Sequence, residues 1–114
     1  MERKRVFIVD DEKDHCYILK SYFQSKNYDV SIGFNVKEFR ELLEQKEPDI
    51  LLLDNNLPDG KGWALTGSLV EQYPRLKIYL ISAYHQKGDP VPAHENITVW
   101  QKPISLSLLN ASFA

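Results

Sequence analysis

Five short apolar runs are spaced along this chain, and longer amphipathic stretches separate them. The central run, Ile-Leu-Leu-Leu at residues 50–53, ends abruptly at Asp54 and is followed by a Pro-Asp-Gly turn. A continuous apolar run bounded by turn residues is typical of a strand buried on both faces, as in a parallel sheet. We therefore expect a buried strand over residues 49–54. Asp54 would stand at its carboxyl end, where open α/β sheets bind their ligands.

The same pattern predicts the other elements. Further strands are expected at residues 5–9, 30–33, 77–82 and 99–101. Apolar residues at helical spacing predict helices over residues 13–26, 36–45, 63–73 and 105–113. Asn35 is the expected N-cap of the second helix, with Glu38 in capping-box position. Asn27 is suited to end the first helix, because asparagine tolerates the left-handed conformation.

Strands and helices alternate over the whole chain, without internal repeats or a low-complexity linker. This order predicts an α/β domain with a single doubly wound, five-stranded parallel sheet covered by helices on both faces. Residues 85–96 are the exception, because Gly88, Pro90 and Pro92 lie where a helix belongs. An interior proline costs a helix about 3 kcal/mol, so we expect an irregular fourth crossover. The last helix is expected to be short.

Composition narrows the class of protein. The 114 residues suggest one domain, and 43% hydrophobic with 26% charged residues indicates a packed domain. The net charge of -2, without a basic stripe, argues against nucleic-acid binding by this domain. The four apolar residues after the basic start are too few for a signal peptide or a membrane span. The single cysteine, Cys16, excludes an internal disulfide; we expect a buried thiol and a cytoplasmic location.

Chemically active side chains gather at the predicted strand ends. They are Asp10 and Asp11 after the first strand, Asp54 at the third, Ser82 at the fourth and Lys102 after the fifth. Three carboxylates along one sheet edge repel each other unless their pKa values rise or a cation binds. Carboxylate oxygens suit Mg²⁺, and Lys102 and Ser82 suit the anion of a phosphoryl group. Asp54 would then be the nucleophile that forms an acyl phosphate.

With these motifs the chain resembles the receiver domains of two-component response regulators, the CheY-like proteins. The resemblance covers about residues 5–109 and rests on VFIVDDE at 6–12, DILLLD at 49–54, LPDG at 57–60, ISA at 81–83 and KP at 102–103. It implies the flavodoxin-like strand order 2-1-3-4-5. It also implies a cis peptide bond between Lys102 and Pro103.

The resemblance further implies roles for the site residues. Asp54 would be the phosphoacceptor in a Mg²⁺-dependent phosphorylation, and Ser82 and Lys102 would contact the phosphoryl group. The magnesium ligands would be Asp10, Asp11, Asp54 and the main-chain carbonyl of Asn56. The phosphodonor would be a sensor histidine kinase or a histidine phosphotransfer domain, and a phosphorylation-linked dimer stays open. The domain would catalyse only its own phosphorylation and dephosphorylation. We expect a receiver domain over residues 1–114, with excision from a longer response regulator or hybrid protein left open.

Two departures from the family concern the face that many receivers use to dimerise or to contact an output domain. Receivers usually carry Tyr or Phe three residues before the lysine, where this chain has Val99, and Trp100 should face the opposite side of the sheet. Together with the proline-broken crossover, Val99 favours signalling through a non-standard surface. Tyr84, two residues after Ser82, is expected to shield the acyl phosphate from water.

Other functions remain as alternatives. Val99 favours a receiver-like module that binds partners without phosphorylation. An aspartate-nucleophile phosphatase would need a second aspartate where Asn56 stands. A flavin mononucleotide site would need a phosphate-binding loop where residues 10–12 are acidic. The three histidines are expected to be solvated or structural, and both tryptophans to be packing residues: His15, His85, His94, Trp63 and Trp100.

Overall fold

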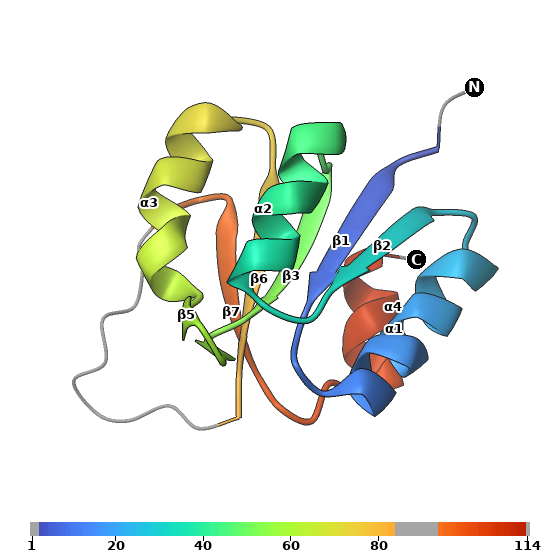
Figure 1. Ribbon diagram of the computed structural model, residues 1–114. Helices are drawn as coiled ribbons and strands as arrows, with labels where there is room; N and C mark the ends of the chain where they lie inside the picture. Colours follow the sequence, from blue (N-terminus) through green and yellow to red (C-terminus); the bar gives the residue numbers. More distant parts are fainter. Residues whose placement is uncertain (1–2, 84–93, 114) are drawn as a thin grey trace.

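The computed structural model describes residues 3–83 and 94–113. Its main sheet has five parallel strands in the order β2-β1-β3-β6-β7 (Figure 1). The strands are β1 (Arg5–Val9), β2 (Asp29–Gly33), β3 (Ile50–Asp54), β6 (Lys77–Ser82) and β7 (Ile97–Gln101). Numbered within this sheet alone, the order is 2-1-3-4-5, so the predicted fold class is confirmed. The central strand β3 is buried along its whole length, as its continuous apolar run predicted.

Within the described residues, four helices cover the two faces of the sheet (Figure 1). They are α1 (Lys13–Ser25), α2 (Val36–Gln45), α3 (Trp63–Gln72) and α4 (Leu106–Phe113). Ile8 and Leu52 of the sheet pack in one core cluster with residues of α1 and α4. Their neighbours Phe7 and Leu51 pack in a second cluster with residues of α2 and α3. Successive strand side chains thus point to opposite faces and build two separate cores.

The predicted helix ends at Asn27 and Asn35 are present in the structure. Asn27 has φ 67°, the left-handed conformation expected after α1. The Asn35 side chain accepts a hydrogen bond from the Glu38 N–H at 2.8 Å, which confirms it as the N-cap of α2. The Glu38 carboxylate accepts from the Phe34 N–H at 2.7 Å, one residue before the cap.

A small hairpin, which the sequence pattern did not predict, lies between β3 and α3. Its strands are β4 (Asn56–Leu57) and β5 (Gly60–Lys61), paired antiparallel around the Pro-Asp turn. Asp59 in this turn accepts hydrogen bonds from the first N–H groups of α2, from Val36 at 2.8 Å and Lys37 at 3.1 Å. These N–H groups have no partner within the helix, so the Asp59 carboxylate ties the hairpin to α2.

We expect Asp59→Ala to lower the thermal unfolding midpoint, and Asp59→Asn to lower it less, because the amide keeps one acceptor oxygen. The two hydrogen bonds, the one from Val36 first, lower the pKa of Asp59. The stabilisation by this carboxylate should therefore be present at neutral pH and be lost as acid titrates it. Circular dichroism melts at pH 7 and in acid measure this, with Glu41→Ala on the exposed side of α2 as control. Equal midpoints for Asp59→Ala and the control would contradict the assignment.

The edge strand β7 presents two different faces. Val99 is 38% exposed, whereas Trp100 is 7% exposed and packs against the ring of Tyr79 at a centroid distance of 4.5 Å. The predicted opposite orientation of these two side chains is confirmed. The expectations for Tyr84 and for most of the fourth crossover fall on residues 84–93, outside the described residues. No helix in the described part of the chain has the length and hydropathy needed to cross a membrane.

Candidate functional site

Three carboxylates converge at the carboxyl edge of the sheet. Asp10 and Asp11 follow β1, and Asp54 is the last residue of the neighbouring strand β3. Asp10 is 1% exposed and Asp54 is 4% exposed, whereas Asp11 is exposed. One carboxylate oxygen of each residue lies within 4.8 Å of the other two. The structure thus brings together the acids that the strand-end argument predicted.

The backbone around Asp54 is held on two sides. The Asn55 N–H donates to the Ile81 carbonyl of β6 at 2.8 Å, and the Asn55 carbonyl accepts from the Gly62 N–H at 2.9 Å. The Asn55 side chain accepts from the Trp63 N–H, at the start of α3, at 3.1 Å. Asn55 is 3% exposed, so this amide is a buried clamp between β3 and α3. It is a site residue that the sequence pattern did not indicate.

Lys102 completes the cluster from the far side. Its peptide bond to Pro103 is cis, as predicted, and its N–H donates to the Ser82 carbonyl at 2.9 Å. The Lys102 Nζ lies 3.1 Å from Asp10 Oδ2 and 3.4 Å from Asp54 Oδ2. A third carboxylate, that of Glu12, lies 3.1 Å from the same ammonium. Lys102 therefore interacts with the acidic cluster and is not a solvated surface lysine.

Ser82 and Asn56 are the remaining predicted site residues. Ser82 is the last residue of β6, is 3% exposed, and follows Ile81, which pairs with Asp54 in the sheet register. Asn56 is exposed in the hairpin; its N–H donates to Asp54 Oδ1 at 3.0 Å, and its side chain accepts from Lys61 at 2.6 Å. Both predicted residues are therefore close in the chain or the sheet to the central carboxylate.

The two buried carboxylates have opposite pKa shifts. Burial raises the pKa of Asp54 to about 6, and the negative charge of Asp10 raises it further. The hydrogen bond from the Asn56 N–H and the positive charge of Lys102 act in the opposite direction. Burial also disfavours ionisation of Asp10, but hydrogen bonds from His15 and Glu12 and the charge of Lys102 outweigh it and lower the pKa of Asp10 to about 2. Proximity to both acids raises the pKa of Lys102 against the opposing effect of burial. The surroundings thus favour the ionised form of Asp10 and disfavour the ionised form of Asp54.

His15 contacts the acidic cluster, and the sequence alone did not predict this contact. Its Nδ1–H donates to Asp10 Oδ2 at 2.7 Å, and its side chain is 17% exposed. The contact joins the first turn of α1 to a residue five positions earlier, across the loop that follows β1. Because such a contact depends on the loop path and not on helical or strand spacing, no sequence periodicity signals it. His94, by contrast, accepts the Asn96 N–H within a turn, in keeping with the expected structural role.

Cys16 lies behind the acidic cluster. It is fully buried, and its Sγ–H donates to the Asp10 main-chain carbonyl at 3.2 Å. Burial, together with the negative charge of Asp10, raises the pKa of this thiol to about 12. The thiol is therefore protonated at neutral pH, and the prediction of a buried cysteine is confirmed.

The acidic cluster has the donor set for a small divalent cation. Mg²⁺ takes oxygen ligands at about 2.0–2.1 Å, so two ligands on opposite sides of the ion are about 4 Å apart. The spacing of Asp10, Asp11 and Asp54, within 4.8 Å of one another, is close to this value. Two of the three side chains are buried and the third faces solvent, which leaves an approach for the ion and for an incoming anion.

Comparisons with known proteins agree with this geometry. Residues 6–111 match the family described as the response regulator receiver domain. The chain is 37% identical over 84 residues to the response regulator protein PilR of Pseudomonas aeruginosa; this covers 74% of the chain and 19% of PilR. The chain thus spans about a fifth of that relative.

Two solved structures share the fold. One is a response regulator from Burkholderia pseudomallei with a phosphorylated aspartic acid, a calcium ion and citrate, with TM-score 0.81, 19% identity, and coverage of 97% of this chain and 66% of that one. The other is TrrA from Thermotoga maritima in complex with Mg²⁺ and BeF, with TM-score 0.69, 24% identity, and coverage of 88% and 89%. Together with the family match over almost the whole sequence, these comparisons place the chain in the family of response regulator receiver domains of two-component systems.

Proposed function

We propose that this chain accepts a phosphoryl group on Asp54, in a Mg²⁺-dependent reaction with a phosphohistidine on a sensor histidine kinase or a histidine phosphotransfer domain. The observation that carries this proposal is the convergence of Asp10, Asp11 and Asp54 at one sheet edge, with the Lys102 ammonium in contact with two of them. In metal-dependent phosphoryl transfer, positioning and charge neutralisation provide most of the catalysis, and this edge offers both.

The residues divide the reaction between them. A carboxylate oxygen of Asp54 attacks phosphorus, and the bond from phosphorus to the imidazole nitrogen of the donor breaks. The electron pair of that bond leaves with the imidazole, so that Asp54 becomes an acyl phosphate. Lys102 exchanges its contact with Asp54 for a phosphoryl oxygen, and the Ser82 hydroxyl, on the adjacent strand, donates to another. Asp10, Asp11, Asp54 and the Asn56 carbonyl would hold Mg²⁺, and the ion would supply positive charge to the phosphoryl oxygens.

The proposal is tested by incubating the purified chain with acetyl phosphate, with Mg²⁺ or with EDTA. Intact-mass spectrometry is expected to show one added phosphoryl group with Mg²⁺ and none with EDTA. Ca²⁺ in place of Mg²⁺ is a useful comparison, because Ca²⁺ prefers more ligands at longer distances. Equal phosphorylation in EDTA would show that the acids do not act through a metal.

His15 is expected to support metal binding by orienting Asp10. His15→Leu should weaken Mg²⁺ binding about 10-fold or more, because partners that orient a metal ligand typically contribute that much. His15→Asn, whose side chain can still donate an N–H, should retain more of the affinity. Isothermal titration calorimetry with MgCl₂ measures both variants, with His94→Leu as the control histidine. A His15→Leu variant with unchanged Mg²⁺ affinity would rule out the orienting role.

A second candidate function is a receiver-like module that binds its partner without phosphorylation. The observation that favours it is Val99, which is 38% exposed on β7 where receivers usually carry an aromatic ring. The two functions differ in one measurement, the affinity for an isolated partner with and without beryllofluoride. We favour the phosphoaccepting function, because the acidic site and Lys102 are complete. We further propose that the chain acts chemically only on itself and works in the cytoplasm.

A further inference from the structure

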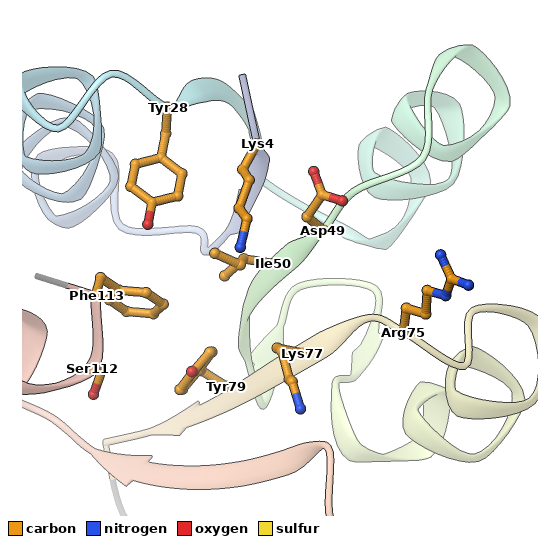
Figure 2. A pocket seen from close by; sticks show the side chains of 9 residues that line it. All are labelled: Lys4, Tyr28, Asp49, Ile50, Arg75, Lys77, Tyr79, Ser112 and Phe113. Carbon is orange, nitrogen blue, oxygen red and sulfur yellow. The ribbon is translucent and has the colours of Figure 1, made fainter. Parts of the chain in front are cut away.

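A second polar pocket lies at the opposite edge of the sheet, where the strands begin. It has a volume of about 410 Å³ and is drawn in Figure 2. A cavity of this size is in the range that holds a small molecule. It lies between the turn after α1 and the end of α4, over the first residues of β3 and β6. None of its lining residues belongs to the acidic site at the carboxyl edge.

Positive charge dominates the lining of this pocket. Lys4, Arg75 and Lys77 line it, and Asp49 is the one acid among the lining residues. The Asp49 carboxylate accepts the Arg5 N–H at 2.8 Å. Figure 2 shows the Lys4 side chain extending into the pocket beside Ile50.

Within residues 3–83 and 94–113, no carboxylate forms an ion pair with Lys4, Arg75 or Lys77. In that part of the chain, the Lys4 and Arg75 side chains form no hydrogen bond or ion pair, and the Lys77 Nζ donates to the neutral amide of Asn96 at 2.9 Å. The strand register keeps the cationic segments together: the Arg5 carbonyl accepts from Asp49 at 2.9 Å, and the Asp49 carbonyl accepts from Lys77 at 3.1 Å. The backbone of three adjacent strands therefore positions an excess of positive charge at one cavity.

Aromatic rings form the other side of the same pocket. Tyr28, Tyr79 and Phe113 line it, and the Tyr28 and Phe113 rings lie on the side away from Arg75 (Figure 2). Edge-to-face packing fixes these rings: Tyr79 and Phe113 have centroids 5.0 Å apart, and Phe23 and Tyr28 have centroids 5.4 Å apart. Rings held in this way offer a surface on which a planar group can stack at little entropic cost.

We propose that this pocket binds a small anion that carries a planar ring, the chemistry of a nucleotide. The phosphates would pair with Lys4, Lys77 and Arg75, and the ring would lie against Tyr28 and Phe113. This site is separate from Asp54, and its occupation does not require phosphorylation or a divalent ion.

The test is a titration of the isotope-labelled chain with ADP in EDTA, followed by amide chemical shifts. EDTA keeps divalent ions from linking the nucleotide to the acidic edge, so the result is independent of the phosphorylation proposal. ADP is expected to shift the amides of Lys4, Tyr28 and Lys77, and to bind more tightly than either inorganic phosphate or adenosine. The double variant Lys4→Gln with Lys77→Gln should weaken ADP binding about tenfold or more, because it removes two charge-assisted contacts.

The matched control is Lys37→Gln with Arg40→Gln, which removes the same charge from exposed positions on α2, on the other face of the sheet. This control should bind ADP as the unmodified chain does. The proposal would be overturned if ADP caused no shift at the amino edge, if the control variant weakened binding equally, or if inorganic phosphate bound as tightly as ADP. Displacement of ADP by polyglutamate at equal charge concentration would also overturn it, since the pocket would then recognise an acidic peptide.

Discussion

Asp54→Asn is expected to abolish phosphorylation of this chain by acetyl phosphate, while leaving the fold intact. The amide matches the carboxylate in shape but has no nucleophilic oxygen anion, so the acyl phosphate cannot form. Intact-mass spectrometry after incubation with acetyl phosphate and Mg²⁺ measures the result. Asp59→Asn, in the neighbouring hairpin, is the control and should still be phosphorylated at Asp54. Phosphorylation of Asp54→Asn to the level of the unmodified chain would place the phosphoacceptor elsewhere.

The same substitution should stabilise the metal-free protein at pH 7 to 8. Burial raises the pKa of Asp54 to about 6 in the folded chain, against an ordinary value of 3.8. Ionisation of Asp54 above pH 6 therefore costs folding free energy, and an uncharged amide avoids that cost, on the order of 2 kcal/mol. As the pH falls from 6 to 4, the unmodified chain takes up this proton on folding and becomes more stable, so the advantage of Asp54→Asn shrinks.

Urea unfolding in EDTA at pH 7.5 and pH 5, followed by tryptophan fluorescence, tests this pH dependence. Asp10 affects the free energy of unfolding in a different pH range. Its pKa is lowered to about 2, so its contribution to stability is lost only in stronger acid. A constant difference between Asp54→Asn and the unmodified chain across this range would contradict the raised pKa.

Gly62→Ala is expected to destabilise the chain by about 3 kcal/mol and to disturb the site, because overpacking beside a rigid backbone forces the structure to move. A Cβ on Gly62 would lie 2.5 Å from the Asp54 carbonyl oxygen and 3.1 Å from the Asn55 Cα. Gly62 has φ -59°, an ordinary helical value, so the requirement for glycine here is close approach and not backbone conformation. Relief requires α3 to move away from the strand that carries Asp54.

Gly67 in the middle of α3 is the matched control. A Cβ there would meet no atom within 4 Å, so Gly67→Ala should stabilise the chain by about 0.5–1 kcal/mol through helix propensity. Urea unfolding of both variants gives the free energies, and Mg²⁺ titration shows the effect on the acidic cluster. If both glycine variants had the same stability, the close contact of Gly62 with the Asp54 carbonyl would not constrain this fold.

The strand-end acids could be predicted from sequence because their position follows from two simple rules. Buried strands of a parallel sheet have continuous apolar runs, and their carboxyl ends lie along one edge. Asp10 and Asp54 directly follow or end such runs, and Lys102 directly follows β7, so their meeting required no knowledge of side-chain geometry. Asn27 and Asn35 were predictable for a related reason, since each acts on residues within one helical turn.

Other parts of the structure depend on contacts that the hydrophobic periodicity of the sequence does not predict. The β4–β5 hairpin has strands of two residues each, too short to show alternation. The His15 contact with Asp10 follows the path of one loop, and the Asp59 contact with Val36 joins segments 23 residues apart. The basic pocket is drawn from five separate segments of the chain, so its charges meet only in the folded structure.

The central claim is that Asp10, Asp11 and Asp54 hold one divalent ion that prepares Asp54 to receive a phosphoryl group. A crystal structure of this chain grown with Mg²⁺ and beryllofluoride tests it most directly. The expected result is one Mg²⁺ bound by these carboxylates, with beryllofluoride on Asp54 and Lys102 turned toward its fluorine atoms. Carboxylates that point apart with no ion between them, in a crystal that contains both reagents, would contradict the claim.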